Sequence, residues 1–259
     1  MAQLIKCQDY ISRYEMDIYR YPSQYVRLKK QHWDALLEMW LKDEWPENET
    51  IIVEETKISL FTKMREFVKK KPSKLLDSAV EEKGEERPAF TFLPHLSYVP
   101  DTEEELKQFF LDQLYSFQLT WASSTFTQRS IMDRKYQYDP TLRYLLQRFP
   151  DTFLVLYEPI LLIKKAPVEC HTILISPTDV WCIVFLEGKE NEAYIGSKER
   201  FWEKKFGDSS AKVLNPVVAL NRMESIVHSI FQHHQVDLPI KKVVISRTGY
   251  VDYPSPQLI

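Results

Sequence analysis

Two apolar segments in the C-terminal half of the chain, 171-HTILIS-176 and 180-VWCIVFL-186, are separated by the short turn 176-SPTD-179. Their β-branched and aromatic residues are typical of strands, and the proline and aspartate between them are typical of a turn. The second segment runs directly into Glu187-Gly188-Lys189. Because side chains alternate along a strand, Glu187 and Lys189 are expected on the same side of the sheet. Such a pair could bind a divalent metal and stabilise the charge of a phosphate.

The segments around this pair predict a mixed sheet flanked by helices. Further strands are expected at 152–159, 160–165 and 241–247, and helices at 140–149 and from Pro216 to about Phe231. Both helices begin with a capping residue and a proline, Asp139-Pro140 and Asn215-Pro216. The cap accepts hydrogen bonds from free backbone N–H groups, and proline suits the first helical position. The order of elements predicts an α/β (α+β) fold.

The N-terminal half has the spacing of helices rather than of strands. Apolar and aromatic residues recur every three to four positions, which predicts helices at about 8–21, 25–40, 58–70 and 103–119. A turn is expected at 43–50 and a mobile connection at 72–88, where charges and prolines gather. We therefore expect two domains, a helical region at 1–135 packed on an α/β domain at 138–255.

Composition excludes several classes of protein. The 259 residues carry a net charge of −3, without the basic excess of a dedicated nucleic-acid binder. Five glycines and no Gly-rich motif argue against a phosphate-binding loop. The N-terminus lacks an apolar signal core, and no apolar run reaches the roughly 18 residues that span a bilayer. We expect a cytoplasmic protein with no membrane partner, whose cysteines, Cys7, Cys170 and Cys182, are buried thiols.

Several segments between Tyr138 and Tyr253 resemble the nuclease-related domain (NERD), a branch of the PD-(D/E)XK nuclease-like folds. The matching segments are 153-FLVLYEP-159, 170-CHTILISPTDVWCIV-184, 194-YIGSKERFWEKK-205, 215-NPVVALNRMESIVHSIF-231 and 243-VVIS-246. The most specific parts are the Asn-Pro helix start, followed by Asn221 and Arg222, and the Tyr-x-Gly-Ser…Phe-Trp segment. The resemblance covers a little under half of the chain and implies a nuclease-like fold with a Mg²⁺-dependent site.

The chain departs from this family at the residues that would hold the metal. The family's Asp-His pair reads Cys170-His171 here, and counting without gaps places its Glu-x-Lys pair on Val184 and Leu186. Glu187 and Lys189 fit that motif only after a shift of about three residues, and an odd shift reverses the face of a strand. The helix at 140–149 contains no acidic residue. Since cysteine is a poor ligand for Mg²⁺, we predict a degenerate metal site.

Three functions follow from these observations. The first is a NERD-type protein without a working metal site and without a cofactor, which binds nucleic acid or a protein partner. The second is a Mg²⁺-dependent DNA phosphodiesterase with Glu187 and Lys189 as catalytic residues, in which Glu187 and Glu169, or Asp179 instead of Glu169, hold the metal. The third is a scaffold that dimerises through its aromatic helices.

Each candidate site also has an ordinary structural explanation. Lys198, Arg200, Lys204 and Lys205, with Lys212, surround Phe201 and Trp202 and could bind a nucleic-acid backbone, or they could be the solvated side of an amphipathic helical turn. Glu187-Gly188-Lys189 could equally be a hairpin turn, and His171 a core or edge residue. His233 and His234 follow a helix and lack a second ligand pair for zinc. The aromatic residues of the N-terminal half fit a helical core or a groove for a partner.

Overall fold

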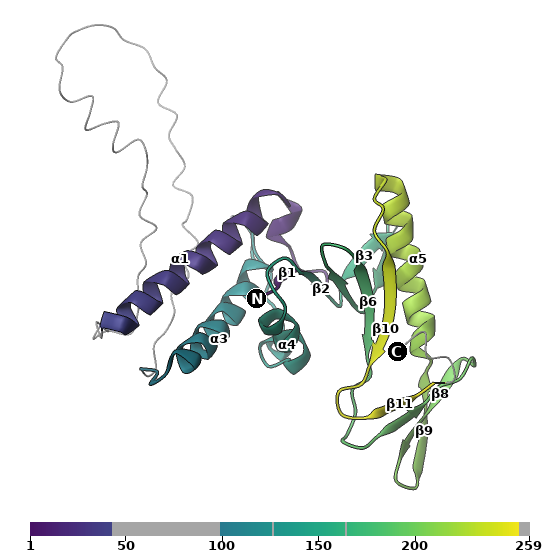
Figure 1. The fold of residues 1–259 in the computed structure, drawn as a ribbon. Helices are drawn as coiled ribbons and strands as arrows, with labels where there is room; N and C mark the ends of the chain where they lie inside the picture. Colours follow the sequence, from purple (N-terminus) through teal and green to yellow (C-terminus); the bar gives the residue numbers. More distant parts are fainter. Residues whose placement is uncertain (43–98, 126, 164, 254–259) are drawn as a thin grey trace, which may run out of the picture. The chain divides into compact units, whose positions relative to one another are not determined.

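The computed structural model describes residues 1–42, 99–125, 127–163 and 165–253 (Figure 1). By internal contacts the chain forms two compact units, Gln24–Phe117 and the remainder, Met1–Ser23 with Gln118–Ile259. The described residues form an α+β fold with mixed sheets, as the order of elements predicted. The helix predicted at 58–70, the turn at 43–50 and the connection at 72–88 lie outside the described residues. Within the described ranges, no helix is long and apolar enough to cross a membrane.

The unit Gln24–Phe117 contains most of two long helices, α1 (Arg20–Lys42) and α3 (Glu103–Trp121). Both were predicted from their spacing, and Tyr25, Leu28 and Leu36 are buried on the predicted face of α1. The rings of Trp33 and Phe110 join the two helices, with centroids 5.5 Å apart. Aromatic residues therefore contribute to a helical core in this unit.

The larger unit is built on a five-stranded sheet in the order β1-β2-β5-β6-β10. Its strands are β1 (Gln3–Cys7), β2 (Leu154–Tyr157), β5 (Thr172–Ile175), β6 (Val180–Phe185) and β10 (Ile240–Ile245). β2, β5 and β6 are antiparallel neighbours, whereas β1 and β10 run parallel to β2 and β6. The hairpin β3 (Ile160–Ile163) and β4 (Ala166–Glu169) follows β2.

The N-terminal segment differs from its prediction. Residues 8–21 were predicted as a helix, but the structure contains β1, a 3₁₀ turn η1 (Arg13–Glu15) capped by Ser12, and only then α1. β1 pairs with β2 from Gln3 opposite Leu154 to Cys7 opposite Tyr157. This pairing joins segments about 150 residues apart, and local periodicity carries no signal of it. β1 therefore belongs to the α/β unit, and the chain does not divide at the expected boundary between residues 135 and 138.

The helix α5 (Pro216–His234) covers one face of this sheet beside β10 and β6 (Figure 1). The Asn215 side chain accepts a hydrogen bond from the Val217 N–H, which confirms the predicted cap. Leu220, Met223 and Val227 of α5 pack in one hydrophobic cluster with Ile173 and Val184 of the sheet. Burial of these apolar side chains stabilises this layer.

The same unit contains a second sheet in the order β11-β7-β8-β9. Its strands are β7 (Ala193–Ile195), β8 (Phe201–Phe206), β9 (Ser209–Leu214) and β11 (Tyr250–Asp252). The alternative that placed Phe201 and Trp202 on a helical turn is therefore wrong, since both residues lie in β8. Trp202 opposes Val213, is buried, and stacks on Tyr253 with ring centroids 5.2 Å apart.

Two short helices precede β2. The 3₁₀ helix η2 (Arg134–Gln137) begins after Asp133, and α4 (Pro140–Arg148) begins after Asp139. The Asp139 carboxylate accepts hydrogen bonds from the N–H groups of Thr141 and Leu142, at 2.9 and 3.0 Å. Leu142, Leu145 and Leu146 form the buried face of α4.

Candidate functional site

The Glu187 carboxylate lies at a cavity of about 440 Å³ beside the end of β6. Ile183, Phe185 and Glu187 line this cavity, whereas Val184 and Leu186 pack in or against the hydrophobic cluster under α5. The alternation of β6 therefore continues to Glu187 and turns its carboxylate away from the cluster. Val184 and Leu186, the two positions that the family's Glu-x-Lys pair reaches when the sequences are compared without a gap, therefore point to the apolar side of the sheet.

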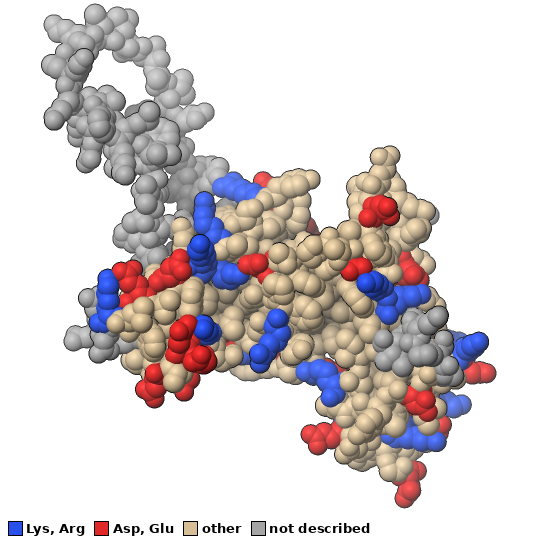
Figure 2. Space-filling model, in the orientation of Figure 1, with Lys and Arg blue, Asp and Glu red and all other residues tan. Residues whose placement is uncertain are grey.

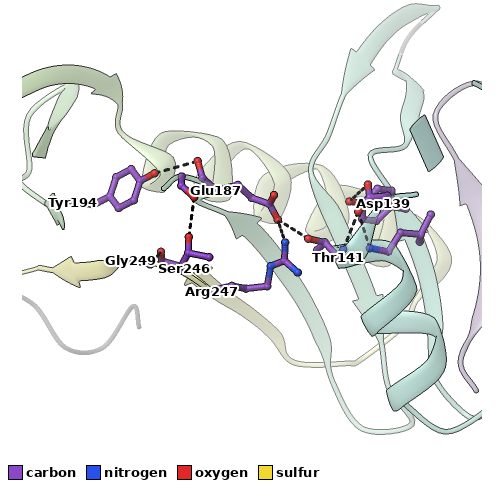
Figure 3. A network of polar contacts seen from close by, with 11 residues as sticks. Asp139, Thr141, Glu187, Tyr194, Ser246, Arg247 and Gly249 are labelled. Atoms are coloured by element: carbon purple, nitrogen blue, oxygen red, sulfur yellow. Dashed lines mark hydrogen bonds and ion pairs between the residues drawn. The ribbon is translucent and has the colours of Figure 1, made fainter. Parts of the chain in front are cut away.

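Two hydrogen-bond donors from distant segments hold the Glu187 carboxylate (Figure 3). The Arg247 guanidinium donates to Glu187 Oε1 at 2.7 Å, and the Thr141 hydroxyl donates to the same oxygen. Arg247 follows β10, and Thr141 lies in the first turn of α4. The carboxylate therefore links β6, β10 and α4, and a charged group already neutralises it.

The Asp139 carboxylate lines the same cavity, and both of its oxygens accept hydrogen bonds. Oδ1 caps α4, and Oδ2 accepts the hydroxyl of Tyr157 at 2.7 Å. Burial, together with this carboxylate, raises the pKa of Tyr157, so the phenol remains protonated and continues to donate. The sequence identified Asp139 only as a helix cap, and its position at the cavity depends on α4 lying against β2.

Glu158 contributes a third carboxylate to the cavity from an unusual backbone conformation. Glu158 and its neighbour Gln8 both have positive φ angles, 46° and 47°. The Glu158 carboxylate accepts hydrogen bonds from the Tyr136 hydroxyl at 3.1 Å and from the Gln8 amide at 3.4 Å. Left-handed backbone costs energy for residues other than glycine and often occurs at functional sites. The sequence analysis missed this residue, because nothing local marks a left-handed glutamate.

The structure does not bring the other predicted metal and catalytic residues to Glu187. β6 ends at Phe185, so strand alternation does not extend to Lys189, whose Nζ lies 5.3 Å from the centroid of the Phe206 ring. A Cβ at Gly188 would collide with the Glu192 carboxylate, so that carboxylate would have to shift to accommodate a side chain there. Glu169 lines a different cavity, and Asp179 forms an ion pair with Lys241 at 2.9 Å.

The two cysteines of this region are not placed to join Glu187 in a metal site. Cys170 and Cys182 are buried in the hydrophobic cluster beneath α5. Burial raises the pKa of both thiols, that of Cys182 to about 12, so they are protonated at neutral pH. Among the described residues no group of three His, Cys, Asp or Glu side chains could hold a metal ion. These residues do not fit the Mg²⁺ site that the family resemblance implies.

The basic residues proposed for nucleic-acid binding are spread along the four-stranded sheet and its approach. Lys204 forms an ion pair with the buried Glu192 at 2.7 Å, and Lys205 with Glu203 at 3.6 Å. The Arg200 guanidinium lies over the Phe201 ring, 5.6 Å from its centroid, and Lys198 is exposed. Figure 2 shows Lys and Arg side chains interspersed with Asp and Glu side chains over this sheet. The lysines of the strand are therefore neutralised within the sheet.

His171 lines both the cavity at Glu187 and a second cavity of about 560 Å³. Partial desolvation lowers the pKa of its imidazole, although the residue is exposed overall; the nearby Glu158 carboxylate opposes this shift and the Arg222 guanidinium adds to it. The ring is consequently neutral at physiological pH and can donate from one nitrogen and accept at the other. His171 is the sequence-predicted residue that connects the two cavities.

Comparison with known proteins gives one short match. No family model matches the chain, and no solved structure matches it. A stretch of 40 residues is 48% identical to part of an RNA 2',3'-cyclic phosphodiesterase from Geobacillus stearothermophilus. The stretch covers 15% of this chain and 13% of that protein, so the likeness is confined to a small part of each.

Proposed function

We propose that this chain is a nuclease-like protein of the NERD type whose metal centre is not assembled, and that it acts by binding nucleic acid. The observation that carries the proposal is the ion pair of Glu187 with Arg247, reinforced by Thr141. A catalytic divalent cation would have to compete with this guanidinium for the carboxylate. It would also lack a second acid that is not already engaged, because the Asp139 and Glu158 carboxylates of this cavity accept hydrogen bonds within the protein and Glu169 lines the other cavity.

The segment 129–144, part of which lines the cavity, supports nucleic acid as the ligand. Tyr138 lines the cavity and is 78% exposed, and Tyr144 on α4 is 56% exposed. Exposed aromatic rings provide stacking surfaces for bases of any sequence. Lys135 of the same segment also lines the cavity, and Arg129, Arg134 and Arg143 are the other cations of residues 129–144.

Both aspartates in this segment act as helix caps. Asp133 caps η2 and Asp139 caps α4, so each accepts hydrogen bonds from the backbone. The segment 129–144 carries four basic and two acidic residues, although the whole chain is slightly acidic, and this excess favours a phosphate backbone. This local excess supports binding better than the neutralised lysines of the four-stranded sheet.

The proposal is tested by measuring cleavage and binding separately. Plasmid and single-stranded DNA are incubated with the protein and Mg²⁺ or Mn²⁺, beside the variants Glu187→Gln and Lys189→Ala. We expect no cleavage with any of the three proteins. Fluorescence anisotropy of a labelled oligonucleotide should show binding that weakens as salt increases, because binding releases counterions from the phosphates.

Variants at the cavity wall locate the binding surface. Tyr138→Ala and Lys135→Gln should each weaken binding, whereas Lys205→Gln, which removes a neutralised charge from the other sheet, should leave it unchanged. Metal-dependent cleavage by the wild type that both Glu187→Gln and Lys189→Ala abolish would establish the competing phosphodiesterase function. Absence of binding at any salt concentration would instead favour a protein partner.

A further inference from the structure

The second cavity, of about 560 Å³, adjoins the candidate site and contains a cation that the proposed function has not used. Glu158 and His171 line both cavities, so the two share a wall. Arg222 and Met223 of α5 and Glu169 of β4 line the second cavity but not the first. A ligand in the first cavity could therefore extend past His171 toward Arg222.

Arg222 is held in place without a carboxylate partner. Its Nη2 donates to the backbone carbonyl oxygen of Glu169 at 2.9 Å. Among the described residues no ion pair joins its guanidinium to an acidic side chain, although other cations of this unit, including Lys204, Lys241, Lys242 and Arg247, have such partners. This hydrogen bond holds one nitrogen of the guanidinium in place, and the other N–H groups can donate to a ligand.

We propose that Arg222 forms a phosphate subsite in the second cavity, next to the candidate site. The proposal rests on the proposed function, because a strand bound at the first cavity would place a neighbouring phosphate within the second. The planar guanidinium matches the geometry of two phosphate oxygens and can donate to both. The neutral ring of His171 stands between the two cavities as an additional donor.

The two carboxylates in this cavity differ in whether they are already hydrogen-bonded within the protein. Glu158 is engaged by Tyr136 and Gln8, so it is already hydrogen-bonded within the protein. The Glu169 side chain also lines the cavity, and its negative charge opposes an anion. Arg222 and Glu169 therefore give a pair of substitutions with opposite expected effects on phosphate binding.

The experiment compares the wild type with Arg222→Gln, Glu169→Gln and Arg148→Gln. Arg148 is exposed on α4 and lines neither cavity, so its substitution is the control for a simple loss of one positive charge. The probes are inorganic phosphate, titrated by calorimetry, and a labelled single-stranded oligonucleotide, followed by anisotropy over a range of salt. Circular dichroism of each variant checks that the fold is retained.

We expect Arg222→Gln to weaken oligonucleotide binding roughly tenfold, the value of one charge-assisted hydrogen bond, and to reduce the slope of log affinity against log salt by about 0.7. Glu169→Gln should strengthen binding, and Arg148→Gln should change it much less than Arg222→Gln. If inorganic phosphate binds in an Arg222-dependent way but the oligonucleotide does not bind, the subsite is confirmed for a free phosphate and the proposed function fails. If the oligonucleotide binds equally to the wild type and to Arg222→Gln, the subsite is refuted while the proposed function stands. Absence of Arg222-dependent binding with both probes also refutes it.

Discussion

The five-stranded sheet and the four-stranded sheet of the larger unit use charged residues in different ways. In the four-stranded sheet, lysines and glutamates follow one another along the chain and pair within the sheet, as Lys204 does with Glu192. At the five-stranded sheet, carboxylates from three separate segments, Asp139, Glu158 and Glu187, meet at one cavity beyond the strand ends. A run of charge in the sequence is therefore a weaker sign of a binding site than single charges that the fold brings together.

The largest expected effect concerns the layer that holds the five-stranded sheet. Leu220 on α5 is completely buried in the hydrophobic cluster, so Leu220→Ala should lower the free energy of unfolding by about 2–5 kcal/mol. Leu214 at the end of the four-stranded sheet is exposed, so Leu214→Ala should change it by less than about 0.5 kcal/mol. Urea denaturation of both variants measures the contrast, and equal losses would show that the two sheets do not differ in this respect.

The ion pairs of the four-stranded sheet should differ according to the burial of the carboxylate. Lys204→Gln leaves the buried Glu192 without its partner, which lowers the melting temperature. Lys205→Gln removes an exposed pair with Glu203 and should have little effect. Differential scanning calorimetry of the two variants gives the comparison. A larger decrease in melting temperature for Lys205→Gln than for Lys204→Gln would contradict the stabilising role of the pair between Lys204 and Glu192.

His171 should make the stability of the five-stranded sheet depend on pH. Its pKa in the folded protein is lowered, chiefly by burial, so in the window just below 6.5 the unfolded chain binds more protons than the folded one. The contribution of the neutral ring is complete above the unfolded pKa and is lost as the pH falls toward the folded pKa. The free energy of unfolding should thus decrease on acidification through this window, and less so for His171→Gln.

NMR titration of the imidazole gives the pKa directly. Arg222→Gln should raise the pKa of His171 relative to the wild type, because the guanidinium disfavours the protonated ring. A folded pKa at or above 6.5 in the wild type would refute the prediction that burial dominates.

The smallest expected effect is on the ion pair that closes the candidate site. Arg247 and Glu187 are both partly exposed, so Arg247→Gln should lower the free energy of unfolding by less than about 1 kcal/mol. Because the other carboxylates of the cavity, Asp139 and Glu158, are already hydrogen-bonded within the protein, we expect no Mg²⁺-dependent cleavage by this variant. Recovery of cleavage in Arg247→Gln would show that this guanidinium alone blocks a metal centre.

Sequence patterns predicted the elements that are specified locally. The helices after Asp139 and Asn215 begin where a cap and a proline occur together, and the strands of β5 and β6 correspond to the two apolar segments. β1 was missed because its partner β2 lies about 150 residues away, and aromatic spacing near Tyr10 and Tyr14 imitates a helix. Similarly, the aromatic residues of 201–202 gave no indication that they alternate between the faces of a strand.

The candidate site was predictable only in part, for the same reason. Glu187 could be identified because it ends the apolar segment 180–186 in the sequence, and His171 because it matches the histidine of the family that the sequence resembles. Asp139 reads as a cap and Glu158 as an ordinary loop glutamate until α4 and β2 are placed together. The position of Lys189 depends on the turn at Gly188, which packs closely against the Glu192 and Tyr194 side chains.

The pairing of β1 with β2 has a consequence for the order in which the protein is made. The ribosome releases Gln3–Cys7 long before Leu154–Tyr157, so the edge strand remains unpaired while about 150 further residues are synthesised. Closing so long a loop costs entropy before any ladder bond repays it, which favours late docking of this strand. During that interval Leu4 and Ile5 present an unpaired apolar edge, and a chaperone that covers this segment would protect the nascent chain from aggregation.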